Sequence, residues 1–322
     1  IFISQKYKIP HMLTSFFGKS KPINYILLSI AIIIGYFFGL LTTQDLSLSL
    51  GSLSSHGLVI FLMVFAVLLL DFIIRKNNVT KNNTFAILLF VLFVLLVPEV
   101  YNDPKLILAN IFVLLATRRI LSLTTEKNTV KKIFDATMYI TLASFCYGWA
   151  ILFFVVLYPA ITNKTKFTLT YLFIPIIGFL GITSIAVAYQ FVVTDSYSWL
   201  YHWIPERDFD LSGYGDIGLF ITTVFLLGLL LWMGGARLSR LASLSKKERP
   251  SAITILLIAI ISVGIVLAKT QKNGSELFFL FAPIAAITSN YIESGTSKIR
   301  RVVSEVFLWS LFVLVLVLPL IR

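Results

Sequence analysis

The chain has 322 residues, of which 58% are hydrophobic and 13% are charged, and its formal net charge is +12. A water-soluble chain of this length cannot bury so much apolar surface, so the composition excludes a soluble globular protein. The apolar runs are continuous rather than alternating, which disfavours a transmembrane β-barrel. The sequence also lacks a basic face with interleaved aromatic residues, so it does not indicate a nucleic-acid partner. The sequence therefore predicts an all-α polytopic membrane protein that contacts membrane lipids.

The first 21 residues carry four lysines and predict a cytoplasmic N-terminal segment, and residues 22–322 predict one integral-membrane helical domain. A helix that crosses a bilayer core needs ~20 predominantly apolar residues. Runs at or near this length occupy residues 22–43, 57–74, 169–193, 217–233, 252–268 and 302–321.

Several middle runs are shorter, at residues 85–97, 106–116, 136–148 and 149–161. Short helices are tolerated at membrane depth where they contact protein or line a water-filled cavity. Between the third and sixth spans we therefore expect a local thinning of the bilayer or a cavity that opens outward.

Lysine and arginine concentrate in cytoplasmic loops, which sets the orientation of the spans. By this rule the cytoplasmic loops are 76–83, 118–134 and 236–250, and the external ones are 44–55 and 194–215. The alternation predicts about eleven transmembrane or half-spanning helices, provided that residues 135–161 form a helical hairpin turning near Cys146–Trp149. If that hairpin is instead one tilted span, the orientation of every later span is reversed. The basic loops disfavour this alternative.

The external segment at residues 194–215 has an aromatic first half and an acidic second half. Its tryptophans and tyrosines predict a short helix in the headgroup zone. His202 and Trp203 lie in this half, as a binding pair or as interfacial anchors. Neither a metal motif nor a cofactor motif is present, so we expect neither group.

Lys269 and Lys272 break the orientation rule, because the alternation of loops places them outside. Glu276 follows within a few residues, and two interpretations are open. The three charges form a solvated rim, or the lysines bind an anionic group.

Two stretches resemble the C-type integral-membrane glycosyltransferases, which take sugars from polyprenyl-phosphate carriers. One is P-E-V-Y-N-D-P-K-L-I-L-A-N-I-F-V-L-L-A-T-R-R-I followed by F-D-A-T-M-Y-I-T-L-A-S-F-C-Y-G-W-A-I-L-F-F, and the other is K-N-G-S-E-L-F-F-L-F-A-P-I-A-A-I-T-S-N-Y. They are similar in layout: short helices, a basic turn and an aromatic bend, then a charged turn before an aromatic-leucine run. The whole chain also resembles an uncharacterised multi-pass family of flavobacterium-like bacteria, which implies the bacterial inner membrane.

The resemblance to glycosyltransferases implies transfer of a glycosyl group from a polyprenyl-phosphate-linked sugar to an acceptor outside the cytoplasm. Asp45 would be the general base on the acceptor hydroxyl. The superfamily usually carries an acidic residue or an acidic pair near aromatic residues early in this loop, whereas the loop here is short and Asp45 is its one acidic residue. Lysines would neutralise the donor phosphate as the sugar leaves. The expected substrate-binding residues are Glu99, Asp103, Lys269, Lys272, Glu276, His202 and Trp203.

Two other classes of function remain open at this stage. One is a non-enzymatic membrane subunit that packs against a larger complex and stabilises it, and the other is a carrier or flippase for a lipid-linked substrate. An external cavity that joins Asp45, an acid from residues 99–103 and Lys269 or Lys272 would favour the enzyme. That hypothesis also expects Asp45 and the lysine that shares its cavity, Lys269 or Lys272, to be free of tight local ion pairs.

Overall fold

The computed structural model describes residues 12–43, 50–164, 167–203, 212–270, 272–295 and 298–321. These residues form helices and connecting turns with no strand among them, so the predicted all-α class is confirmed. Eight helices within the described residues are long and apolar enough to cross a membrane. They are α2 (Pro22–Thr43), α3 (Leu50–Lys76), α5 (Pro104–Leu121), α8 (Thr170–Thr194), α10 (Ile217–Ser239), α11 (Arg249–Ala268), α12 (Phe278–Glu293) with the 3₁₀ turn before it, and α13 (Lys298–Ile321).

Shorter helices and 3₁₀ turns complete the described chain. The α-helices are α1 (Met12–Phe17), α4 (Phe85–Leu96), α6 (Thr129–Cys146), α7 (Phe154–Thr162) and α9 (Ser198–Trp203). The 3₁₀ turns are η1 (Pro98–Asn102), η2 (Ser122–Thr124), η3 (Gly148–Phe153), η4 (Ser212–Gly215), η5 (Leu241–Ser243) and η6 (Ser275–Leu277).

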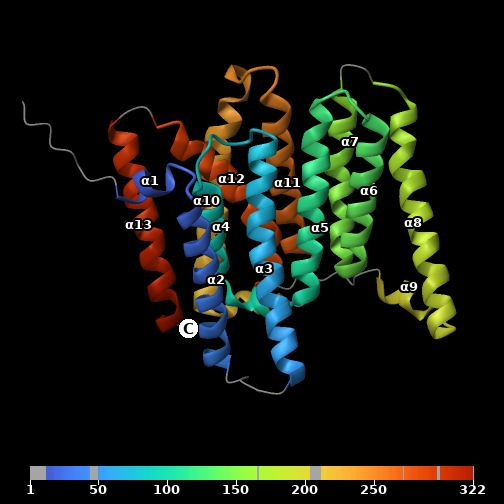
Figure 1. Cartoon of the computed structure of the whole chain (residues 1–322), viewed down its shortest axis with the longest axis horizontal. Helices are drawn as coiled ribbons and strands as arrows, with labels where there is room; N and C mark the ends of the chain where they lie inside the picture. The colour runs from blue at the N-terminus through green and yellow to red at the C-terminus, as the bar shows by residue number, and fades with distance from the viewer. Residues whose placement is uncertain are drawn as a thin grey trace, which may run out of the picture.

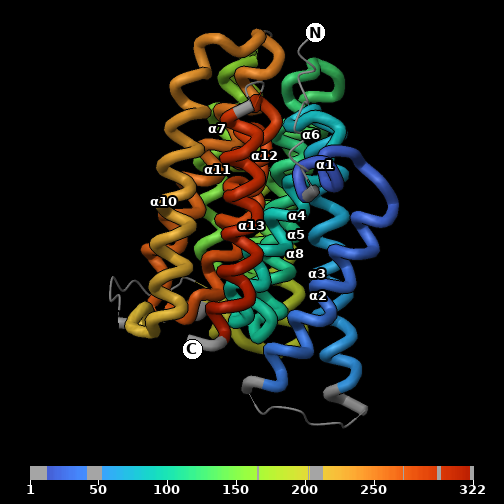
Figure 2. The backbone as a smooth tube through the Cα atoms, turned by 90° about the vertical axis from the view of Figure 1, so that its left-hand side faces the viewer, coloured from blue at the N-terminus to red at the C-terminus, as the bar shows by residue number. Residues whose placement is uncertain are grey.

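The helices stand side by side with α13 and α8 at opposite edges (Figure 1). The view turned by 90° shows α10 on one side of the bundle and α2 and α3 on the other (Figure 2). The predicted hairpin turn near Cys146–Trp149 is confirmed. Helix α6 ends at Cys146, Tyr147 is extended, and η3 leads back into α7.

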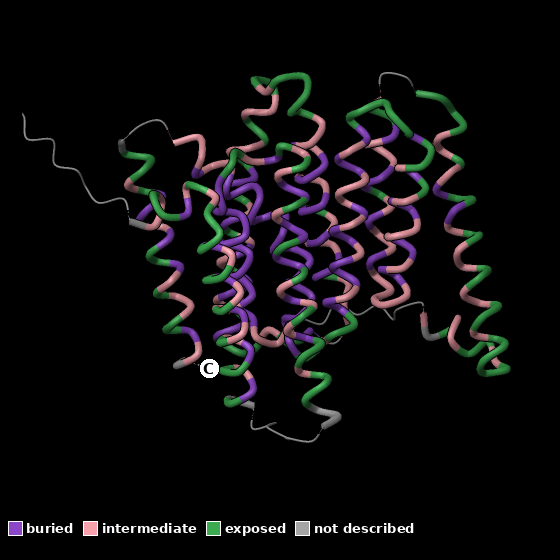
Figure 3. The backbone as a smooth tube through the Cα atoms, viewed as in Figure 1, coloured by how far each residue is buried: buried purple, intermediate pink, exposed green. Residues whose placement is uncertain are grey.

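Helices α4 and α12 form the centre of the bundle, and burial decreases toward its edges (Figure 3). The sequence of α4 is apolar on every face, and all its residues except Leu95 are buried. A helix that is hydrophobic all round belongs inside protein. The rings of Phe90 and Phe93 lie 5.5–6.4 Å from those of Phe278 and Phe281 on α12.

The shortness of α4 is explained by this central position. Its 12 residues rise by roughly 18 Å, less than the ~30 Å of a hydrocarbon core. Neighbouring helices cover it, so protein rather than lipid or a cavity surrounds this short segment.

A proline inside α12 is accommodated by a serine of α11. Pro283 has no N–H, so the carbonyl oxygen of Phe279, four residues earlier, loses its helical donor. The hydroxyl of Ser262 lies 3.0 Å from that oxygen and 2.8 Å from the carbonyl oxygen of Ile258. Its single proton is shared between them. Such side-chain compensation is how prolines are tolerated within membrane helices.

Replacing Ser262 by Ala should therefore lower the free energy of unfolding by about 1–2 kcal/mol, because the buried carbonyl of Phe279 loses this donor. Ser310→Ala is the matched control, since Ser310 is exposed and bonds its own helix at the carbonyl of Phe307. Denaturation of both variants in detergent measures the difference. Equal losses in the two variants would contradict the compensation.

Candidate functional site

The two ends of the bundle differ in charge. We call the end where α3, α5, α7, α10 and α12 finish the basic end, and the other the acidic end (Figure 1). Among the described residues, nineteen lysines and arginines and six carboxylates lie toward the basic end. Three lysines and five carboxylates of the described chain lie toward the acidic end.

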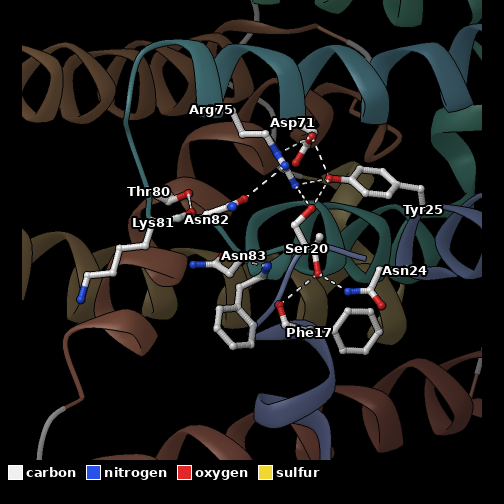
Figure 4. Close-up of polar contacts among 12 residues, drawn as sticks. Phe17, Ser20, Asn24, Tyr25, Asp71, Arg75, Thr80, Lys81, Asn82 and Asn83 are labelled. Atoms are coloured by element: carbon white, nitrogen blue, oxygen red, sulfur yellow. Dashed lines mark hydrogen bonds and ion pairs between the residues drawn. The ribbon is translucent and has the colours of Figure 1, made fainter. Parts of the chain in front are cut away.

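Polar side chains at the basic end hold helix ends together (Figure 4). Arg75 pairs with Asp71 at 2.7 Å and donates to Ser20, just before α2, and to Tyr25 in the first turn of α2. In the same way Arg119 on α5 pairs with Asp135 on α6 at 2.9 Å. These carboxylates have partners within the fold, which assigns them a structural role.

The acidic end brings two distant segments into contact. The turn η1, between α4 and α5, packs against η6, which precedes α12. Glu99 lies in η1, and Asp103 caps α5 by accepting a hydrogen bond from the Leu106 amide at 3.0 Å. The predicted residues Glu99, Asp103, Lys269, Lys272 and Glu276 therefore share one end of the bundle, in segments that touch or adjoin.

A buried carboxylate lies at the centre of this end. Glu276 is 0% exposed, and its Oε1 accepts a hydrogen bond of 2.7 Å from the hydroxyl of Tyr214. Its Oε2 pairs with Nζ of Lys269 at 3.0 Å. Lys269 also donates to Ser275 at 2.9 Å and to Asn273. A buried charge is stable only when it is paired and hydrogen-bonded, and both oxygens of Glu276 meet this condition.

Of the two lysines expected to be free of tight ion pairs, Lys269 is not, because it pairs with Glu276. The buried carboxylate of Glu276 requires a nearby positive charge, and Lys269 supplies it. The alternative of a solvated rim is wrong, since Glu276 is buried and Lys272 is 6% exposed. Nζ of Lys272 donates to the carbonyl oxygen of Lys269 at 2.9 Å, where it complements the negative end of the α11 dipole.

Close backbone contacts build the same cluster. Gly274 has a φ of +88°, and a Cβ there would lie 2.5 Å from the side chain of Leu219 on α10. A Cβ on Gly213 would lie 2.0 Å from the carbonyl oxygen of Lys272. Glycine at both positions therefore allows η4 and α10 to approach the turn that carries Glu276.

Two tyrosines that the sequence did not single out complete the cluster. Burial raises the pKa of Tyr214, and the bonded Glu276 raises it further, so Tyr214 stays a protonated donor. Burial also raises the pKa of Tyr147, in the turn after α6, and the charges of Glu276 and Asp103 add to that effect. The Tyr147 hydroxyl is buried and has no hydrogen-bond partner among the described residues. An unbonded buried hydroxyl close to two carboxylates is suited to a polar ligand or water.

A second polar contact joins α2, α3 and η1. The hydroxyl of Tyr36 bonds Nδ1 of His56 at 2.5 Å, and its ring lies edge-on to Tyr101 at 5.2 Å. Tyr101 donates to the carbonyl oxygen of Ile32 at 3.3 Å. These residues lack a recognisable motif, because they converge from three separate segments.

The aromatic half of segment 194–215 packs against the helix ends. Helix α9 lies across the end of α8 (Figure 1). Trp203 donates from Nε1 to the carbonyl oxygen of Ser144 on α6 at 2.8 Å and stacks on Trp199 at 5.9 Å. These contacts make Trp203 an anchor between α9 and α6. The headgroup-zone position of α9 stays a prediction.

Asp45 and the side chain of His202 lie outside the part of the chain that the structure describes. In the described residues, no group of three or more His, Cys, Asp and Glu side chains is placed to hold a metal ion.

No protein-family model, curated protein or solved structure gives a significant match to the chain. Function therefore has to be inferred from the residues themselves.

Replacing Glu276 by Gln should destabilise the protein by about 3–5 kcal/mol, because Lys269 would keep its charge in a largely buried position without a counter-charge. The double variant Lys269→Gln/Glu276→Gln should recover part of that loss. Denaturation in detergent measures both, with the exposed Glu248→Gln as control. A Glu276→Gln variant as stable as the control would show that the pair does not hold this end together.

Proposed function

We propose that the chain crosses a bacterial inner membrane eleven times, with the basic end in the cytoplasm. The excess of lysine and arginine at that end supports this orientation. The eight long helices, together with α4, α6 and the η3–α7 arm, account for the eleven crossings. The acidic end then faces the non-cytoplasmic side.

Single cysteines introduced into a Cys146→Ser background test this topology. A cysteine at position 195, at the acidic end of α8, should react with a membrane-impermeant maleimide in intact spheroplasts. A cysteine at position 246, between α10 and α11, should react only after permeabilisation. The reverse pattern of labelling would contradict the proposed orientation.

We propose that the protein transfers a glycosyl group from a polyprenyl-phosphate-linked sugar to an acceptor at the acidic end. The observation that carries this proposal is the buried, unbonded hydroxyl of Tyr147, which lies in the field of the Glu276 and Asp103 carboxylates at the end of the bundle where η1 packs against η6. Carboxylates accept hydrogen bonds from sugar hydroxyls, and a tyrosine hydroxyl donates or accepts. A site at a helix end also lets the polyprenyl tail stay in the bilayer.

In the proposed reaction Asp45 accepts the proton of the acceptor hydroxyl. The acceptor oxygen bonds to the anomeric carbon of the sugar, the bond from that carbon to the phosphate oxygen breaks, and polyprenyl phosphate leaves. Asp45 follows the last residue of α2, Thr43, by two positions, and α2 packs against η1, where Glu99 lies. Glu99 and Asp103 would position the sugar.

The structure changes the roles proposed for the two lysines. Lys269 has three N–H donors and three acceptors in Asn273, Ser275 and Glu276, so we assign it to positioning Glu276. We assign Lys272 to the donor phosphate, whose growing negative charge a nearby ammonium stabilises as the sugar leaves.

Replacing Asp45 by Asn keeps the size of the side chain and removes the base, so transfer should fall by a factor of roughly 10²–10⁴ while donor binding persists. The assay is the protein in vesicles with a panel of polyprenyl-phosphate sugars, followed by mass spectrometry of the products. Asp195→Asn is the matched control, since Asp195 has a φ of +48° that Asn tolerates well. Absence of transfer by the unmodified protein, or equal transfer by both variants, would contradict the proposal.

A membrane subunit is the second candidate function, and α8 is the observation that favours it. This helix stands at the edge of the bundle (Figure 1). Of the residues in its most apolar stretch, 11% are buried. Tyr189 is 67% exposed and Ser184 is exposed on the same helix, and both carry polar groups that a partner helix can bond. Mass spectrometry of the proteins that co-purify in mild detergent separates the subunit from the enzyme. Loss of one co-purifying partner from the Ile185→Arg variant would favour the subunit.

A further inference from the structure

A cavity of about 210 Å³ lies at the basic end, between the ends of α5 and α7 and the start of α11. Its floor is apolar and includes Ile120, Ala160 and Leu257. Its rim is polar and basic, and includes Lys164 and Lys246. The cavity is thus apolar on one side and cationic on the other, far from the Glu276 cluster.

The lysines of the rim have little compensation within the protein. Within the described ranges, Lys164, Lys246 and Lys247 form no ion pair. Lys164 donates to the hydroxyl of Thr129, a neutral acceptor. Glu126 is the carboxylate among the lining residues. Burial lowers the pKa of Lys164, and the charge of Glu126 opposes that effect.

A further ammonium adds to the positive charge beside the cavity. Nζ of Lys132, in the first turns of α6, donates to the carbonyl oxygens of Ser122 and Thr125 at 2.7 and 3.0 Å. These acceptors are neutral, so they hold the side chain in place without cancelling its charge. The region therefore keeps a net positive charge that an anion would offset.

We propose that this cavity binds the phosphate headgroup of an anionic lipid from the leaflet at the basic end. A phosphate oxygen can accept hydrogen bonds from the rim lysines, while the glycerol and upper acyl carbons cover the apolar floor. Basic pockets between membrane helices at the cytoplasmic side recognise lipid headgroups by this combination. A free phosphate satisfies the rim in the same way and leaves the apolar floor uncovered. This site is independent of the proposed glycosyl transfer, which concerns the opposite end.

Native mass spectrometry of the purified full chain tests the site with phosphatidylglycerol and phosphatidylcholine as probes. The unmodified protein should retain phosphatidylglycerol in preference to phosphatidylcholine. The triple variant Lys164→Gln/Lys246→Gln/Lys247→Gln should bind phosphatidylglycerol about tenfold more weakly or worse, since each nearby lysine contributes to the attraction. The control Lys76→Gln/Lys81→Gln/Lys127→Gln removes the same charge from exposed positions outside the cavity and should bind almost as the unmodified protein does. Equal weakening in the two triple variants would overturn the proposal.

A second variant keeps every charge and fills the floor. Ala160→Phe should reduce retention of phosphatidylglycerol, while the rim lysines stay available to inorganic phosphate. It also carries the test if the triple variant fails to fold. Two results together would overturn the lipid assignment. They are undiminished lipid binding in Ala160→Phe, and a higher melting temperature of the unmodified protein with inorganic phosphate alone. The cavity would then be assigned to a soluble phosphate.

Discussion

The fully buried carboxylate of Glu276 constrains how the acidic end of the bundle is built. A carboxylate removed from water needs a counter-charge and a donor for each oxygen, and Lys269 and Tyr214 provide them from the end of α11 and from η4. Meeting this requirement ties the chain before α10 to the turn before α12. Gly213 and Gly274 allow the close approach that it demands. The neighbouring η1 then packs against η6 at the same end.

Charged side chains have different surroundings at the two ends of the molecule. Few charged residues lie at the acidic end in the part of the chain that the structure describes, and the central one is buried and paired. At the basic end charges are many, and several lysines near the cavity between α5, α7 and α11 have neutral partners or solvent around them. The first arrangement fixes a rigid site with polar groups at defined positions. The second leaves positive charge that attracts anions from the surroundings.

Much of the fold follows from hydropathy and loop charge, because long apolar runs have few alternatives to helices inside a bilayer. The hairpin turn near Cys146–Trp149 was predictable in this way, and so was the common end of Glu99, Asp103 and Glu276. The pairing of Lys269 with Glu276 was not, since it depends on the irregular turn between α11 and η6. Tyr214 lies 62 residues from Glu276 in sequence, and no periodicity links the two. The central position of α4 was not predictable either, because a short apolar run has the same sequence pattern whether protein or a cavity surrounds it.

The most direct test of the central claim is a high-resolution electron cryo-microscopy map of the protein in a lipid nanodisc with a bound polyprenyl-phosphate sugar. We expect density for the sugar at the acidic end, within hydrogen-bond distance of the Tyr147 hydroxyl, with Glu99 and Asp103 beside it. The polyprenyl chain should leave along the adjoining helices into the bilayer. A map in which the Tyr147 hydroxyl is bonded within the protein, with the lipid-linked sugar elsewhere, would contradict the account.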